Sequence, residues 1–542
     1  MILISVSGEY KMVPLYITVL GILCSITIFA LEKTVKPGVN FSAWKKDFRL
    51  PLIHLSIFSF LYFLMVLLTG RLIFAAALVI LLDLVLVVIN YAKYRNLCEP
   101  LVFSDYDYFT DAFRFPRLYL PFLGVYGFLG IFIAAVLLVL GFCLDTSAVD
   151  RFSGKVLITC ITGLAATSII LYLTRNIKKY NSFHPDEDLR KLGFSLYVWS
   201  YFLAYLEKPP VISPFENFSD LSGSSDTDLS KLPHLMAVQS ESFFDPRKWN
   251  PDIRTGVLQD FDAICRESPV SGVLRVPAWG ANTIRTEFSF LTGIAPEAMG
   301  GHQFSPYQIS SRSWHITSFV NYLKKAGYHT ICVHPYYQRF YHRNIIFKKW
   351  GFDEFIDISS FTENDRFGPY TSDEAVKNYV LSRFAESRKN NAPLFVFAIT
   401  MENHGPLHLE SITDEECTGY FNKPVTPEYR DLAKYLRHLA NENNMLKELI
   451  AAFNNMTRPV SLAFYGDHVP ILPEPYSILG KPDGRVPFFV YHCGFKCSRN
   501  QETPVNTTTD NENMEKYPES IEELSVYWLN LVRKLQADSR NY

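Results

Sequence analysis

The chain begins with long apolar runs and then changes to short apolar runs separated by amphipathic and polar stretches. Each long run reaches the roughly 20 residues that an α-helix needs to cross the hydrocarbon core of a bilayer. No small-residue cleavage site ends the first run, so it does not resemble a signal peptide. The pattern predicts five transmembrane helices, at Val13–Leu31, Leu50–Thr69, Leu72–Asn90, Leu118–Leu144 and Val156–Leu173.

From Pro233 onward, short apolar runs alternate with segments of helical periodicity. The predicted strands are His234–Gln239, His329–His334, Leu394–Thr400 and Val460–Tyr465. The predicted helices are Arg285–Thr292, Ser313–Ala326, Thr371–Ser387 (opened by a capping-box pattern, Thr371 to Glu374) and Pro427–Phe453. Strands that alternate with helices of this length predict an α/β fold with a doubly wound, mostly parallel sheet.

The length of 542 residues allows two or three folding units. We predict a transmembrane domain over 1–174, a juxtamembrane connector and linker over 175–233, and a catalytic domain over 234–542. The Ser-, Asp- and Gly-rich segment 219–230 is typical of a flexible linker. The formal net charge of −2 gives no polybasic signal for nucleic acid, so no nucleic-acid partner is expected.

Each predicted strand runs into ionisable groups. Glu241 follows the first strand, His334 ends the second, Glu402 and His404 follow the third, and Asp467 with His468 follows the fourth. The carboxyl ends of the strands in such a sheet form the crevice in which ligands bind. One polar strand end would be an ordinary solvated turn, but four together indicate a site.

Two carboxylates and an imidazole, Glu241, Asp467 and His468, make a three-ligand set for one divalent metal. The set suits Mn²⁺, Mg²⁺ or Zn²⁺ and leaves a position open. Thr283 follows a glycine turn at the start of the predicted helix Arg285–Thr292, whose N-terminus favours an anion. Thr283 is therefore a candidate nucleophile that faces a phosphate, although it also suits an N-cap.

A set of motifs in this order resembles the alkaline phosphatase/sulfatase superfamily, and most closely its membrane branch of lipoteichoic acid synthases and phosphoglycerol transferases of periplasmic glucans. The motifs are Gln239–Phe243, Asn282–Phe288 with Leu291–Gly293, Phe340–Arg343, Asn403–Gly405 and Tyr465–His468. The five apolar runs ahead of them are similar to the lipoteichoic acid synthase layout. The resemblance implies a sulfatase-type catalytic domain behind the membrane helices.

The resemblance also implies roles for individual residues. Four of them would surround the metal, which we expect to be Mn²⁺, with Mg²⁺ or Zn²⁺ possible: Glu241, Thr283, Asp467 and His468. Thr283 would be the nucleophile, and Arg343 and His404 would contact the phosphate. Tyr341 stands where the synthases commonly carry a tryptophan against the glycerol. The Cys/Ser-x-Pro-x-Arg signature of true sulfatases is absent around Thr283, which argues against formylglycine chemistry and sulfate esters.

The function implied is the transfer of phosphoglycerol from phosphatidylglycerol, through a phospho-threonine intermediate, to a cell-surface or periplasmic glycan or polyol-phosphate acceptor. One alternative is a phosphoethanolamine transferase of the same superfamily, although those enzymes typically rely on several disulfides. Here only Cys493 and Cys497 form a candidate pair. A second alternative is a membrane scaffold or transporter with an inactive hydrolase domain, but no expected type of metal ligand is missing.

The predicted side of the membrane depends on which argument is used. Basic residues flank the first, third and fifth spans on the side of the connector, and the positive-inside rule would place the catalytic domain in the cytoplasm. The resemblance implies a bacterial cytoplasmic (inner) membrane protein with its catalytic domain on the external or periplasmic face. Because long domains are translocated largely regardless of loop charge, we expect the external face.

Overall fold

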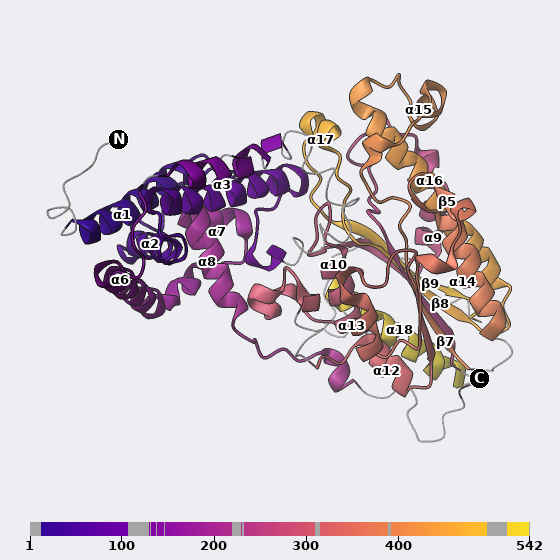
Figure 1. Ribbon diagram of the computed structural model, residues 1–542. Helices are drawn as coiled ribbons and strands as arrows, with labels where there is room; N and C mark the ends of the chain where they lie inside the picture. Colours follow the sequence, from indigo (N-terminus) through magenta and orange to yellow (C-terminus); the bar gives the residue numbers. More distant parts are fainter. Residues whose placement is uncertain are drawn as a thin grey trace. The chain divides into compact units, whose positions relative to one another are not determined.

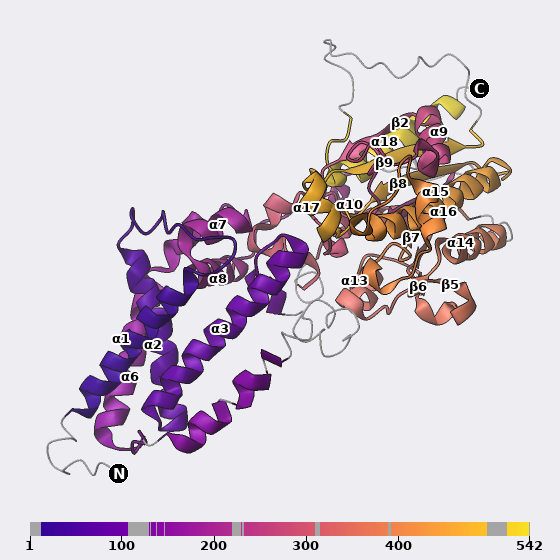
Figure 2. The same ribbon diagram turned by 90° about the horizontal axis from the view of Figure 1, so that it is seen from above.

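The computed structural model describes residues 12–106, 129–130, 132–136, 138–145, 147–218, 229, 232–308, 315–387, 392–495 and 517–540. The chain forms two compact units, Met1–Lys208 and Pro209–Tyr542. Figures 1 and 2 show helices alone in the first unit, and a sheet with helices in the second. Most of the predicted linker 219–230, and Cys497 of the candidate cysteine pair, lie outside the described residues.

The first unit is a bundle of apolar helices. Among the described residues, four helices are long and apolar enough to cross a membrane: α1 (Val13–Glu32), α2 (Arg49–Thr69), α3 (Leu72–Leu97) and α6 (Gly154–Leu173). The core joins all four helices through residues such as Ile17, Tyr62, Ala75 and Cys160. Two shorter helices follow, α7 (Pro185–Leu192) and α8 (Phe194–Tyr205). The predicted span at 118–144 lies partly outside the described residues, and its described part is helical from Phe132 to Leu144.

The second unit is built on a seven-stranded sheet in the order β2-β9-β8-β1-β7-β3-β4. The strands are β1 (His234–Ser240), β2 (Val270–Leu274), β3 (His329–Val333), β4 (Glu354–Ile356), β7 (Leu394–Ile399), β8 (Val460–Gly466) and β9 (Val486–Cys493). Strand β9 is antiparallel to both of its neighbours, whereas the other neighbouring pairs are parallel. The prediction of a mostly parallel sheet is therefore confirmed. A small hairpin, β5 (Arg366–Phe367) with β6 (Tyr370–Thr371), lies outside this sheet.

Helices cover both faces of the sheet, which makes a three-layer α/β/α unit (Figure 1). One face packs against α10 (Thr283–Thr292), α12 (Phe319–Lys325), α13 (Arg343–Lys349) and α18 (Ile521–Arg540). The other face packs against α9 (Gln259–Glu267), α14 (Asp373–Ser387) and α16 (Arg430–Asn454). Two further helices are α15 (Asp414–Tyr420) and α17 (Pro473–Leu479). Because both faces are covered, the central strands are buried along nearly their whole length and are mostly apolar.

The starts of four helices differ from the prediction. Helix α12 begins only at Phe319, because Ser318 caps it by accepting a hydrogen bond from the backbone N–H of Asn321 (3.0 Å). Ser372, not Thr371, accepts the backbone N–H bond in the first turn of α14 (3.1 Å). Helix α16 begins after a 3₁₀ turn, and α10 begins two residues before its predicted start. The Ser318 and Ser372 side chains therefore determine where the helical hydrogen bonding of α12 and α14 begins.

Candidate active site

The four central strands, β8, β1, β7 and β3, lie side by side and are the four that the sequence predicts. Ser240 is in register with Gly466, and Gln239 is in register with Ile399. The loops after β1, β7 and β8 therefore leave the sheet at one edge. This edge carries Glu241, His404 and the Asp467–His468 pair.

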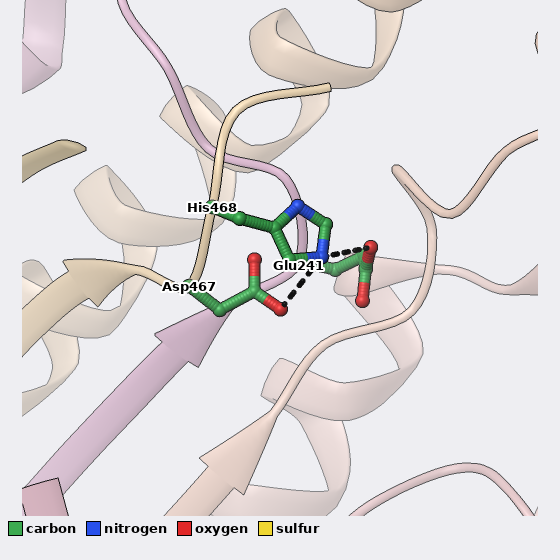
Figure 3. Close-up of side chains that lie close together, drawn as sticks. All are labelled: Glu241, Asp467 and His468. Atoms are coloured by element: carbon green, nitrogen blue, oxygen red, sulfur yellow. Dashed lines mark ion pairs between the residues drawn. The ribbon is translucent and has the colours of Figure 1, made fainter. Parts of the chain in front are cut away.

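Glu241, Asp467 and His468 converge at this edge, as Figure 3 shows. Nε2 of His468 lies 3.7 Å from Oε1 of Glu241 and 3.4 Å from Oδ2 of Asp467. Ligand atoms that share one ion at about 2.1 Å lie roughly 3.0–3.5 Å from one another. All three side chains are buried, and Oδ2 of Asp467 has no hydrogen-bond partner in the structure. The donor set therefore fits a divalent cation.

The surrounding hydrogen bonds prepare these groups for a cation. Nδ1 of His468 lies 3.0 Å from the carbonyl oxygen of Val469, and a carbonyl only accepts, so Nδ1 carries the proton. The lone pair on Nε2 then faces the carboxylates. Burial, and then the neighbouring charge of Asp467, raise the pKa of Glu241. A cation between the carboxylates would relieve this repulsion.

The turn that carries Asp467 depends on Gly466. A Cβ atom at this position would lie 2.2 Å from the carbonyl oxygen of Phe243 and 3.1 Å from Cβ of Val486. Only glycine lets β8 pass this close to the loop after β1. In that loop, the backbone N–H of Ser242 donates to Oδ1 of Asp467 (2.7 Å). The close approach therefore holds Glu241 and Asp467 together.

Thr283 is the first residue of α10 and is half-buried. Asn282, not Thr283, is the N-cap residue, so the expectation that Thr283 caps the helix is wrong. Its side chain is thus not required for capping. One turn later, Oγ1 of Thr286 donates to the carbonyl oxygen of Asp467 (2.7 Å). Because residues three apart lie on the same helix face, this bond turns the Thr283 face toward the Asp467 loop.

Arg343 is buried at the start of α13, with an exposed fraction of 1%. Its Nε and Nη2 each donate to Glu287 at 2.9 Å, and its Nη1 donates to Nε2 of His334 at 3.2 Å. Burial, and then the Arg343 charge, lower the pKa of His334, so its imidazole is neutral. The ring of Tyr341 lies 5.3 Å from the guanidinium carbon. Arg343, predicted to contact the phosphate, and Tyr341, predicted to lie against the glycerol, are therefore neighbours.

His404 lies in the loop after β7 and is half-buried. Its Nδ1 donates to the carbonyl oxygen of Gly405 at 2.7 Å, which leaves Nε2 as an acceptor. Burial lowers the pKa of His404, although the Asp467 charge acts in the opposite direction. Because β7 is parallel to β1 and in register with it, the loop that carries His404 leaves the sheet at the same edge as Glu241.

Unusual backbone conformations occur next to the candidate residues. In the described part of the second unit, the non-glycine residues with positive φ are Ser242 (54°), Asn282 (68°), Tyr341 (56°) and His342 (59°). They adjoin Glu241, Thr283 and Arg343. Such conformations cost about 1–3 kcal/mol each and concentrate at functional sites. The strained backbone positions therefore indicate a functional site at the same residues that the side-chain chemistry selects.

Glu287 binds Arg343, and Gln239 and Tyr307 donate hydrogen bonds to Glu287. None of the three is among the residues predicted for the site. Gln239 carried a signal, because it is a polar residue inside an otherwise apolar strand and is fully buried. Because a buried amide is almost always hydrogen-bonded, Gln239 indicated that another polar side chain lies beside it in the core. Tyr307 carried no such signal.

A family model and curated relatives match the chain. The model described as Sulfatase matches residues 233–511. The capsular polysaccharide biosynthesis protein RkpI of Rhizobium meliloti is 26% identical over 430 residues, which cover 74% of each chain.

Solved structures also resemble the chain. The integral membrane lipooligosaccharide phosphoethanolamine transferase A (EptA) of Neisseria meningitidis is 14% identical, covers 89% of each chain and gives a TM-score of 0.51. The Streptococcus pyogenes phosphoglycerol transferase GacH, solved with sn-glycerol-1-phosphate, is 22% identical. This match covers 53% of this chain and 77% of GacH, with a TM-score of 0.40. The EptA likeness shows the same fold, apolar helices followed by an α/β unit.

Proposed function

Because this chain belongs to the sulfatase family, we propose that it is a metal-dependent membrane transferase that moves phosphoglycerol from phosphatidylglycerol to a surface glycan or polyol-phosphate. The observation that carries the proposal is the convergence of Glu241, Asp467 and His468 beside the helix that begins at Thr283. The residues around Thr283 lack the sulfatase signature, which favours a phosphate ester over a sulfate ester.

Glu241, Asp467 and His468 would hold the cation, with Thr283 beside them. A bound divalent metal, Mn²⁺ first and Mg²⁺ or Zn²⁺ as alternatives, would lower the pKa of a hydroxyl and neutralise phosphoryl charge. Thr283 Oγ attacks the donor phosphorus, and the bond between phosphorus and the diacylglycerol oxygen breaks. Diacylglycerol leaves with a proton. An acceptor hydroxyl then attacks the phospho-threonine, and Thr283 regains its proton.

Arg343 and His404 would act on the phosphate itself. The guanidinium offers planar N–H donors to non-bridging oxygens, and Tyr341 flanks it on the side where the glycerol would lie. In the free enzyme His404 is neutral, because burial lowers its pKa. The negative charge of a bound phosphodiester favours its protonated form, which can then donate to the departing diacylglycerol oxygen.

The membrane helices would keep the site near a donor that cannot leave the bilayer. The name of RkpI supports a surface polysaccharide as the acceptor. We place the catalytic unit on the external face, where such an acceptor is found. Labelling of an engineered cysteine in the linker 219–230 of the cytoplasmic-membrane protein tests this placement. A linker protected from external reagents until the membrane is permeabilised contradicts it.

Phosphoethanolamine transfer is the alternative, and EptA has the same fold over most of the chain. The chain differs from the disulfide-rich pattern expected of those enzymes. In the described part of the second unit, no disulfide joins Cys265, Cys332, Cys417 or Cys493 to another described cysteine. Reconstitution of the full chain in vesicles of either phosphatidylglycerol or phosphatidylethanolamine separates the two functions. We expect diacylglycerol release from phosphatidylglycerol alone, and release only from phosphatidylethanolamine would favour the alternative.

A further inference from the structure

A chain of buried hydrogen bonds runs beneath the site. The Tyr465 hydroxyl donates to Oε1 of Gln239 (2.9 Å), and Nε2 of Gln239 donates to Oε2 of Glu287 (3.4 Å). All three side chains are fully buried. Tyr465 lies two residues before Asp467, and Gln239 lies two residues before Glu241. This series of hydrogen bonds therefore joins β1 and β8, the two strands that lead to the metal ligands, to helix α10.

Glu287 is the residue at which these buried hydrogen bonds meet. Its Oε1 accepts from Arg343 Nε (2.9 Å) and from the Tyr307 hydroxyl (2.6 Å). Its Oε2 accepts from Arg343 Nη2 (2.9 Å) and from Gln239. A carboxylate accepts about four hydrogen bonds, so both oxygens are saturated. Glu287 also lies four residues after Thr283, one helical turn along α10.

We propose that Glu287 is a positioning residue, which fixes the Arg343 guanidinium relative to Thr283 and the metal ligands; this inference rests on the proposed function. The carboxylate occupies the Nε/Nη2 edge of the guanidinium and leaves donors on Nη1 and Nη2 for a phosphate. Without that carboxylate, the long arginine side chain can take other rotamers. Glu287 thereby connects the phosphate-binding group to the elements that hold the nucleophile and the cation.

A purely structural ion pair would make a different prediction. Removal of one partner of a buried pair leaves the other charge unpaired and destabilises the fold, whereas removal of both is often neutral. A structural pair would therefore affect stability and activity in parallel. For a positioning pair, stability and activity change independently. A protein that lacks both Glu287 and Arg343 regains stability but does not regain transfer.

The test uses the full chain in phosphatidylglycerol vesicles, with Glu287→Gln, Arg343→Met and the double variant. Ser461→Ala is the control, because Ser461 accepts a buried hydrogen bond from Trp528 Nε1 (2.8 Å) at the other end of β8. Transfer is measured as kcat and KM, and thermal unfolding and Mn²⁺ binding are measured on the same samples. The control removes buried hydrogen bonding but leaves the Tyr465–Gln239–Glu287 hydrogen bonds in place.

We expect Glu287→Gln to lower kcat/KM by roughly 10²-fold while Mn²⁺ binding is retained. In the Arg343→Met background, Glu287→Gln should cause no further loss of transfer, and the double variant should unfold at a higher temperature than either single variant. Additive losses in the double variant, or near-normal transfer by Glu287→Gln, would overturn the positioning role alone. Near-normal transfer by Arg343→Met would overturn the phosphate contact in the proposed function as well.

Discussion

Gly466→Ala perturbs the site through a single methyl group. The added Cβ would lie 2.2 Å from the Phe243 carbonyl oxygen, well inside van der Waals contact, and Val486 Cβ lies 3.1 Å away. Relief of the overlap requires a displacement of roughly 1 Å between β8 and the loop after β1. That displacement would separate Asp467 from Glu241, because the two residues adjoin the contact.

We expect two consequences of this displacement. Overpacking of a buried position costs about 1–3 kcal/mol of unfolding free energy. A misplacement of roughly 1 Å at a reacting site lowers transfer by about 10²-fold. Weaker Mn²⁺ binding should accompany the loss of transfer, since both candidate carboxylate ligands, Glu241 and Asp467, lie close to the altered contact.

The assay compares Gly466→Ala with Gly419→Ala in the full chain. Gly419 lies in α15, and an added Cβ there would have no atom within 4 Å. Gly419→Ala should be neutral or stabilising, because alanine favours a helix more than glycine does. Unfolding temperature, Mn²⁺ affinity and phosphatidylglycerol turnover are measured for both. Wild-type values for all three in Gly466→Ala would refute the reasoning about this close approach.

Two further outcomes follow from burial and charge. A proton on Glu241, whose pKa is raised by burial and by Asp467, competes with the metal. Mn²⁺ should therefore raise the unfolding temperature more at pH 8 than at pH 6, and an equal rise at both would contradict the assigned ligands. Burial lowers the pKa of His438, but the hydrogen bonds that its ring donates to Glu402 and Glu410 outweigh burial, so the folded-state pKa is raised. The stabilisation that the protonated His438 ring gives the fold is complete below its unfolded-state pKa and is lost as pH rises through its folded-state pKa. His438→Gln should therefore cost more stability at pH 6 than at pH 9, and a cost independent of pH would show that His438 stays neutral.

The central strands were predictable because they are buried on both faces. Mostly apolar runs such as Leu462–Tyr465 end abruptly in polar residues, so β1, β3, β7 and β8 match their predicted bounds within one residue. Strand β2 was not predictable, because Val270–Leu274 is short and its middle residues are exposed. Strand β9 was not predicted either, because it carries a proline at its second position, and proline disfavours the prediction of a central strand from sequence.

The candidate metal ligands were predictable because each lies next to the end of such a strand. The partners of Arg343 were not, since Glu287 is 56 residues away and meets it only when α10 and α13 pack on the same face of the sheet. The cap of α10 also differed from expectation, because Asn282 takes the left-handed conformation before Thr283. Long-range packing and local backbone strain are not encoded in the spacing of residue types.

Peptide mass spectrometry of the enzyme quenched during turnover on phosphatidylglycerol tests the central claim most directly. A phosphoglycerol adduct should be found on Thr283, and acceptor should discharge it. Thr283→Ala should lack the adduct and lose at least about 10³-fold in transfer, because the nucleophile and its pathway are gone. An adduct on another residue, or normal turnover by Thr283→Ala, would contradict transfer through Thr283.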